Sequence, residues 1–207
     1  MPTCGFFADQ PVECTLLRTL EPCPRPRASP NFQFYLEKGF NFLRNELTCK
    51  SSMNLSDILS TEQIVVDLNA VDRWQAIDEL IDCLVSTGKL KAADRSAIVS
   101  VVRKRESSMS TGIGFGIGIP HASTDLLHEV VGALGRSKEG VNFEALDNQP
   151  VNLIVLFLVP QGQFQKHLHT LANIAKLLHR REFRKALEDS PNAAEMYRII
   201  RTESISK

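Results

Sequence analysis

The residues most suited to chemistry lie between Arg105 and His121, in the segment RESSMSTGIGFGIGIPH. Glycine alternates through this segment, at Gly112, Gly114, Gly116 and Gly118. A backbone this rich in glycine can take positive φ angles or approach a bound group closely. The run ends at Pro120, whose fixed φ restricts the path of the chain into His121. We therefore expect the backbone N–H groups of the first three glycines to lie open around an anion beside His121.

A histidine at the end of such a loop suits phosphoryl transfer. The unperturbed pKa of histidine is about 6.5, so a useful fraction of His121 is neutral near pH 7 and a ring nitrogen can attack phosphorus. The P–N bond that forms is labile enough for the group to be passed on. We predict that His121 is a phosphoryl acceptor.

The glycine spacing matches neither common nucleotide-binding motif. GxGxGxG differs from the dinucleotide-binding GxGxxG, and it does not open a predicted helix. No GK[ST] follows it, as a phosphate-binding P-loop requires. A plain turn would also account for the glycines, but not for the histidine that ends the run.

Two other classes of function compete with phosphoryl transfer. A zinc site made of His121, His167 and His169 lacks a carboxylate or cysteine at ligand spacing, and side chains two positions apart on a helix diverge. A ligand-binding module without catalysis gives no reason for a nucleophilic histidine directly after Ile119-Pro120. We expect neither a metal nor a cofactor.

The elements that must position this segment follow from the apolar pattern after Leu55. Asp72 and Gln75 have the spacing of a capping box before an amphipathic helix that Gly88 can end. Strands are predicted over 64–68, 130–134 and 153–159, and further helices over 92–106, 165–179 and 192–201. This order predicts an α/β fold in which helices flank both faces of a mixed β-sheet.

The helix over 165–179 decides which of its histidines can be functional. His167 shares a face with Leu171, Ile174 and Leu178, at steps of four, seven and eleven residues. His169 points largely the other way, so we expect it on the surface. A core histidine bonded to a carbonyl is the alternative interpretation of His167. His128 and His179 match no motif.

Residues 1–52 differ in composition from the rest of the chain. They hold six of the ten prolines, four of the five cysteines and none of the five histidines. No CxxC or Cys/His metal spacing occurs, so disulfides and a zinc site are poorly supported. We predict an N-terminal extension over 1–52, irregular or upstream of the true start at Met53, and a single domain over 53–207. The segment 32–47 is apolar enough to form a helix or to dock.

The whole-chain composition excludes several partners. Lys+Arg and Asp+Glu both number 24, so the formal net charge is +0 and gives no footprint for nucleic acid or an acidic membrane surface. The longest apolar run, VNLIVLFLVP, is about half of the ~20 residues that a membrane helix needs. The first residues lack the pattern of a secretory signal, and we expect a cytoplasmic protein without membrane insertion.

The segment STGIGFGIGIPH, Ser110 to His121, resembles the active-site motif of the fructose/mannitol-type IIA domains (EIIA type-2) of the sugar phosphotransferase system, including their nitrogen-regulatory branch. The resemblance runs from about Leu55 to Ile200. It continues through FEALDNQPVNLIVLFLVP and HLHTLANIAKLL. Gly118 replaces the alanine often found at that position.

The resemblance implies roles for three residues. His121 would accept a phosphoryl group from the histidine phosphocarrier protein and donate it to a IIB domain or a regulatory target. Arg105 matches the active-site arginine of the family, whose guanidinium can pair with phosphoryl oxygens. A solvated arginine at a helix end, beside Arg103 and Lys104, is the other interpretation. His167 matches the second active-site histidine, which helps to hold the phosphoryl group.

The resemblance leaves two uses of the phosphoryl group open. In one, the protein feeds fructose- or mannitol-type sugar uptake. In the other, its phosphorylation state is a signal in nitrogen or carbon regulation. The HLHTLANIAKLL segment looks closer to the regulatory branch.

Overall fold

The computed structural model describes residues 53–205, which lie within one compact unit. The predictions for residues 1–52, including the segment 32–47, fall outside the described residues. The helices are α2 (Leu55–Ile58), α3 (Arg73–Ser86), α4 (Arg95–Ser108), α5 (Phe164–His179), α6 (Arg181–Glu188) and α7 (Ala193–Ile205), with 3-10 turns at Thr61–Gln63 and Ala92–Asp94. The strands are β1 (Ile64–Val65), β2 (Gly112–Gly114), β3 (Ile117–Gly118), β4 (His121–Thr124), β5 (Val131–Val141) and β6 (Val151–Pro160).

The six strands form one mixed sheet with β6 at its centre. The order is β1-β5-β6-β3-β2, and β4 pairs with β6 beyond β3. β5 is antiparallel to β6, whereas β3 and β4 are both parallel to it. The short strands β3 and β4 therefore run one after the other along the same edge of β6, and this places the chain between them beside the central strand.

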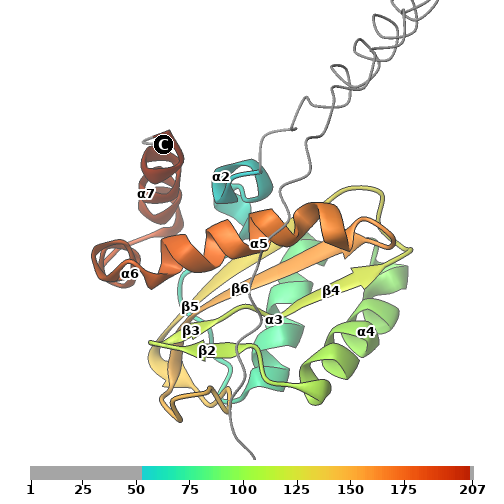
Figure 1. The fold of residues 1–207 in the computed structure, drawn as a ribbon, viewed down its shortest axis with the longest axis horizontal. Coiled ribbons are helices and arrows are strands. Elements are labelled where there is room, and N and C mark those ends of the chain that lie inside the picture. The colour runs from blue at the N-terminus through green and yellow to red at the C-terminus, as the bar shows by residue number, and fades with distance from the viewer. Residues whose placement is uncertain (1–52, 206–207) are drawn as a thin grey trace, which may run out of the picture. The chain divides into compact units, whose positions relative to one another are not determined.

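Helices cover both faces of the sheet, as the sequence pattern predicts (Figure 1). Alternate residues of β6 belong to opposite core clusters, because successive side chains of a strand point to opposite faces. Ile154, Leu156 and Leu158 pack with α3 and α4. The other cluster joins the sheet to α2, α5, α6 and α7, and its β6 members are Leu153, Val155, Phe157 and Val159.

The long helices form where the apolar periodicity predicts them. The Asp72 carboxylate accepts the backbone N–H groups of Trp74 and Gln75 and so caps α3. Gln75 itself accepts the N–H of Val71 rather than that of Asp72, so the capping box is incomplete. After α3, Gly88 takes a φ of 70° where the helix has ended.

The elements that periodicity does not predict lie in the glycine run and after it. Residues 112–118 form the β2–β3 hairpin, and Gly112 packs so closely that a Cβ there would come within 2.8 Å of the Cα of Ala145. β4 and α6 were not predicted either. β4 has four residues and β3 has two, and strands this short carry too few alternations to be recognised from sequence.

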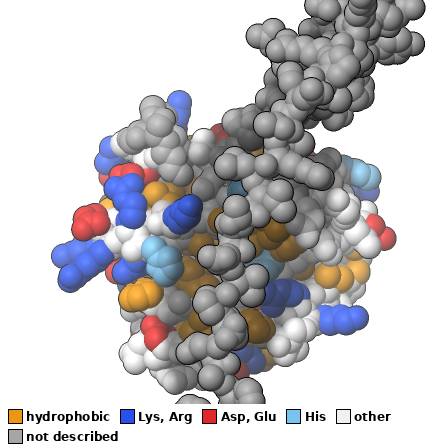
Figure 2. Space-filling view, in the orientation of Figure 1, with side chains coloured by type: hydrophobic (Ala, Val, Ile, Leu, Met, Phe, Trp, Pro, Cys, Tyr) orange, Lys and Arg blue, Asp and Glu red, His pale blue; other side chains and the backbone are white. Residues whose placement is uncertain are grey.

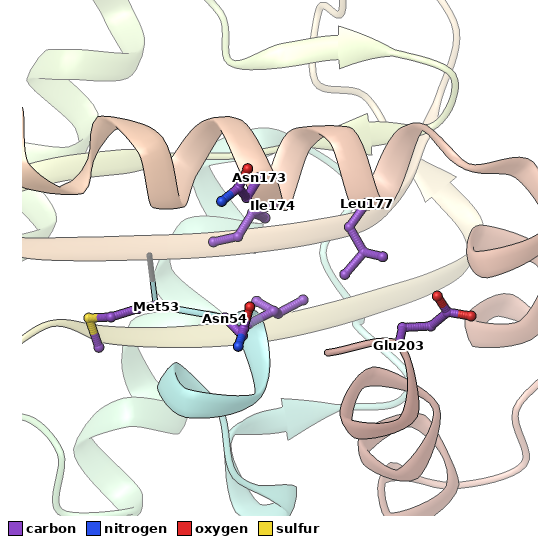
Figure 3. Close-up of a pocket in the computed structure, with 7 residues that line it drawn as sticks. Met53, Asn54, Asn173, Ile174, Leu177 and Glu203 are labelled. Carbon is purple, nitrogen blue, oxygen red and sulfur yellow. The ribbon is translucent and has the colours of Figure 1, made fainter. Parts of the chain in front are cut away.

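A small internal gap marks the seam between α2, α5 and α7 (Figure 3). Its volume is about 10 Å³, which is close to the least that a single water needs. It is lined by Met53, Asn54, Leu55, Asn173, Ile174, Leu177 and Glu203. This gap is a packing feature and is too small to hold a ligand. None of the helices in residues 53–205 is long and apolar enough to cross a membrane.

Candidate functional site

His121 is the first residue of β4, and the parallel pairing with β6 places it opposite Phe157. The carbonyl of Pro120 accepts the N–H of Phe157 at 2.9 Å, so the chain is already hydrogen-bonded to β6 just before the histidine. Pro120 has no N–H of its own to satisfy at this point. The proline therefore fixes the entry of the chain, and the β4–β6 pairing fixes the backbone of His121.

One ring nitrogen of His121 is committed to the backbone. Nδ1 lies 2.9 Å from the carbonyl oxygen of Ile119. Because a carbonyl oxygen only accepts, this bond requires a hydrogen on Nδ1 and leaves the lone pair of the neutral ring on Nε2. The ring also stacks on Phe164, with centroids 5.8 Å apart and an interplanar angle of 17°. Both contacts favour one orientation of the imidazole.

The environment holds His121 neutral. Burial is the largest effect, and it lowers the pKa of His121 below the usual 6.5. The Arg105 charge lowers the pKa further. The hydrogen bond to the Ile119 carbonyl and the Glu106 charge both raise it. The net direction is downward. A neutral imidazole with Nδ1 bonded presents Nε2 as a nucleophile near pH 7.

A cavity of about 400 Å³ adjoins His121 between α4, β4 and the start of α5. The lining residues are Val101, Lys104, Arg105, Ser108, His121, Ala122, Ser123 and Phe164. The lining combines apolar side chains with two cations and two hydroxyl groups. In Figure 2, positively charged side chains lie over the α4 side of the molecule, and others lie over the α6 side. Cations and hydroxyls around a neutral histidine suit a phosphoryl group, whose oxygens need charge and hydrogen-bond donors.

The structure separates Arg105 from its basic neighbours. Arg105 is half-buried, lines the cavity and donates from Nη1 to the carbonyl of Met109 at 3.1 Å. Arg103 points elsewhere and forms an ion pair with Asp78. Lys104 lines the cavity as well, but its side chain is exposed. Of the three basic residues, Arg105 and Lys104 line the cavity and Arg103 does not.

His167 lies one turn beyond Phe164 on α5. It is half-buried, and its ring meets that of Phe157 edge-on, with centroids 6.5 Å apart. Phe157 is also the β6 partner of His121, so its backbone adjoins one histidine and its ring the other. His167 is not among the residues that line the cavity. His169, two residues on, is exposed as predicted.

The glycines of the predicted phosphoryl loop lie away from the cavity. Gly114 and Gly116 have φ angles of 89° and 76° and form the tip of the β2–β3 hairpin, while Gly112 lies in β2. The carbonyl of Gly116 accepts the N–H groups of Asn152 and Leu153, at the start of β6. His121 pairs with Phe157, four residues further along β6, which is about 13 Å at the rise of a strand. None of the three glycines lines the cavity beside His121.

The hairpin tip carries an aromatic residue in an unusual conformation. Phe115 has a φ of 56° and is 66% exposed. Its N–H donates to the Asp147 carboxylate at 2.8 Å, and its ring meets His179 edge-on at 5.4 Å. The Arg184 guanidinium lies 5.8 Å from the ring centroid. Phe115 is therefore a surface residue at the far end of α5 from Phe164.

Sequence reasoning missed four cavity residues, Lys104, Ser108, Ser123 and Phe164. Helical spacing could have found Lys104 and Ser108, since they lie on α4 within one turn of Arg105. No local signal marks Phe164, because its contact with His121 spans more than forty residues of chain. Within residues 53–205, no group of three or more His, Cys, Asp or Glu side chains is placed to hold a metal ion.

Comparison with known proteins supplies a family for this arrangement. Residues 57–203 match the family model described as "Phosphoenolpyruvate-dependent sugar phosphotransferase system, EIIA 2". The fructose-specific EIIABC component of Bacillus subtilis is 36% identical over 148 residues, which are 72% of this chain but only 23% of that protein. The nitrogen regulatory protein of Bradyrhizobium diazoefficiens is 32% identical over 72% of this chain and 95% of its own length.

A solved structure has a fold similar to that of this chain. The nitrogen regulatory protein IIA-Ntr from Neisseria meningitidis superposes with a TM-score of 0.64 and 29% sequence identity. The match covers 70% of this chain and 98% of that structure. The fold described above is thus the fold of a whole known protein, and it corresponds to about a quarter of the longer fructose-specific relative.

Proposed function

This chain belongs to the EIIA 2 family of the phosphoenolpyruvate-dependent sugar phosphotransferase system, and we propose that it carries a phosphoryl group on His121. The group arrives from the histidine phosphocarrier protein and leaves to a IIB domain or to a regulatory target, in the cytoplasm. The observation that carries this proposal is the state of His121. Nδ1 is bonded to the Ile119 carbonyl, burial lowers the pKa of the ring and so favours its neutral form, and the cavity beside it is lined by Arg105 and Lys104.

In the transfer step, the Nε2 lone pair of His121 attacks the phosphorus of the donor phosphohistidine. The P–N bond to the donor breaks, and its electron pair returns to the donor ring nitrogen, which takes up a proton from water in place of the phosphoryl group. Positive charge develops on the His121 ring as Nε2 bonds to phosphorus. The Ile119 carbonyl stabilises that charge through the Nδ1–H bond, because it is already in place when the charge appears.

Arg105 and Lys104 act on the phosphoryl oxygens. Two cations on one helix can offset the negative charge of the group both during transfer and in the phosphorylated protein. Arg105 presents a planar fork of donors, whereas Lys104 presents a mobile point charge. We assign the main stabilising role to Arg105, whose side chain is the less exposed of the two.

We assign His167 a supporting polar role, although it is not among the residues that line the cavity. Its position against Phe157, the strand partner of His121, allows a hydrogen bond to a phosphoryl oxygen once the group is attached. This role depends on the phosphorylated state.

For the biological use of the phosphoryl group, we favour regulation. The support is that this fold accounts for 95% of the Bradyrhizobium nitrogen regulatory protein and 98% of the Neisseria structure. Direct participation in fructose-type uptake is the second candidate, because the fructose-specific EIIABC relative is 36% identical over the same region. In that case a IIB domain would receive the group.

The domain that performs this function is residues 53–207, and residues 1–52 are an extension that transfer does not require. The support is that the family match begins at residue 57 and that α2 already contributes Leu55 and Ile58 to the core.

The proposal is tested by incubating the full chain with phosphoenolpyruvate, enzyme I and the histidine phosphocarrier protein and measuring its intact mass. Wild-type protein should gain one phosphoryl group that is lost in acid and kept in base, and His121→Ala should gain none. An acid-labile phosphoryl group on His121→Ala would show that the acceptor is wrongly assigned. The phosphorylated protein is then mixed with a panel of IIB domains and their sugars. Rapid appearance of fructose or mannitol phosphate would favour the uptake role over regulation.

A further inference from the structure

Glu106 is a buried charged residue that the mechanism above does not use. It follows Arg105 on α4, and only 1% of its surface is exposed. Its Oε1 accepts the backbone N–H of Thr111 at 2.8 Å, and its Oε2 accepts the Thr111 hydroxyl at 2.7 Å. None of the ion pairs within residues 53–205 includes Glu106. Its carboxylate is therefore held by the two donors of a single residue.

Burying a carboxylate without a cation is unfavourable, so the arrangement calls for an explanation beyond packing. Two short bonds from both oxygens to one residue fix that residue in position and orientation. Thr111 lies directly before β2, and the five-residue step from Glu106 ties the end of α4 to the start of the β2–β3 hairpin. Glu106 is thus an anchor between the helix that carries Arg105 and the segment that leads to His121.

Thr111 continues the connection toward the nucleophile. Its carbonyl accepts the N–H of Ile119 at 3.1 Å. The carbonyl of Ile119 in turn accepts Nδ1 of His121, at 2.9 Å. A continuous path of hydrogen bonds and rigid peptide units therefore runs from the Glu106 carboxylate to the His121 ring.

We propose that Glu106 is a positioning residue for phosphoryl transfer, which holds Thr111 and, through Thr111 and Ile119, keeps His121 in the orientation and tautomer that leave Nε2 free beside the cavity. This proposal rests on the proposed function, since it assigns Glu106 to the same transfer step. It also explains why a carboxylate is tolerated beside Arg105, at a site that receives an anion. Both oxygens are turned to Thr111, so the negative charge does not face the cavity as a competing acceptor.

The charge of Glu106 has a second effect on His121. It raises the pKa of the ring, whereas burial and the Arg105 charge lower it. Arg105 and Glu106, which are adjacent on α4, therefore shift the pKa of His121 in opposite directions. The charged groups near the ring are Lys104, Arg105 and Glu106 from α4. α5 contacts the ring through Phe164 and carries the titratable His167, which packs against Phe157. Loss of the Glu106 charge should shift the His121 titration to lower pH.

The test is Glu106→Gln in the full chain, with imidazole ¹⁵N NMR and phosphorylation by the phosphorylated histidine phosphocarrier protein measured side by side. Glutamine keeps the shape but loses the charge, and its NH₂ group cannot accept from Thr111. We expect a smaller fraction of the Nδ1–H tautomer at His121, a lower His121 pKa and a rate reduced about 10-fold, less than the 10²-fold that a 1 Å misplacement can cause. The matched control is Glu182→Gln, because the Glu182 side chain is exposed on α6. This variant should have wild-type values in all three measurements.

Thr111→Val provides a second variant should Glu106→Gln fail to fold. Valine removes only the hydroxyl donor and leaves the backbone N–H for Oε1, so we expect a smaller loss of the Nδ1–H tautomer and of the transfer rate; the Glu106 charge is kept, so no change in the His121 pKa is expected. A wild-type fraction of the His121 Nδ1–H tautomer in either folded variant would overturn the proposal, even if the rate fell. If wild-type protein accepted no phosphoryl group, the proposed function would fail, while the NMR comparison would still decide whether Glu106 orients His121.

Discussion

Nδ1 of His121 lies 2.9 Å from the carbonyl oxygen of Ile119, only two residues earlier in the chain. Such a short loop back onto the backbone is set by the Pro120 peptide between them and by the pairing of β4 with β6. It selects Nε2 as the reactive nitrogen through a backbone carbonyl. The same bond supports the positive charge that the ring acquires when Nε2 binds phosphorus.

His121 should titrate below pH 6.5 in the folded protein, because burial lowers its pKa. Phosphorylation should therefore persist as pH falls from 7 to 6.5 and decline only at lower pH. The unfolded chain keeps the usual pKa and binds the proton more readily, so acid favours unfolding. The contribution of neutral His121 to the free energy of unfolding is therefore fully present above pH 6.5, and it is lost as the pH falls from 6.5 through the pKa of His121 in the folded protein. Urea unfolding of wild type and His121→Gln at several pH values measures the effect, and an equal loss in both proteins would contradict it.

Arg105→Ala should slow phosphorylation by an amount on the order of 10²-fold, since a charge-stabilising donor is lost from the transition state. It should also raise the His121 pKa, because the Arg105 charge lowers it. Rapid-quench kinetics and histidine NMR measure the two effects. Arg201→Ala, an exposed change on α7, is the control. A normal rate with an unchanged His121 pKa would remove Arg105 from the site.

His167→Ala should reduce phosphoryl transfer by roughly 10-fold or more while the protein stays folded, because a hydrogen-bonding group is lost but the apolar face of α5 remains. His169→Ala is a close control, two residues away and exposed. Transfer rates and thermal unfolding are measured for both variants. Equal rates for the two would assign His167 to packing against Phe157 alone.

Phe115→Ala should weaken the docking of a partner protein without changing the chemistry at His121. The ring is 66% exposed and held at a φ of 56°, a strained conformation for a bulky residue. Truncation of a residue that dominates an interface costs more than ~1 kcal/mol of binding, so in that role the loss of Phe115 should raise KM for the phosphocarrier or a IIB domain about fivefold or more at constant kcat. Leu146→Ala, 77% exposed, is the comparison. An unchanged KM for every partner tested would exclude docking through Phe115.

A chain of residues 53–207 should fold and accept the phosphoryl group as the full chain does. The sheet, both core clusters and the cavity are complete within the described residues. Urea unfolding and phosphorylation kinetics of both chains give the comparison. A truncated chain that aggregates, or that accepts the group more slowly, would show that residues 1–52 support the domain.

The amino-acid sequence by itself determined the features that local pattern encodes. The faces of α3 and α5 follow from apolar residues at helical spacing, and the Asp72 cap follows from the chemistry of one side chain. His121 stood out because a proline and a glycine run precede it. His167 and His169 could be distinguished because two helical positions two residues apart diverge.

The tertiary structure alone decided what the pairing with β6 brings together. Gly112 to Gly116 precede His121 closely in sequence, yet the hairpin lies at the start of β6 and His121 pairs four residues further along. Phe164 reaches His121, and Thr111 connects Glu106 to Ile119, through contacts whose partners are set by strand register and by the crossing of helices over the sheet. Register and helix placement depend on how the two cores fill. No segment of the sequence specifies them on its own, because each depends on contacts between residues far apart in the chain.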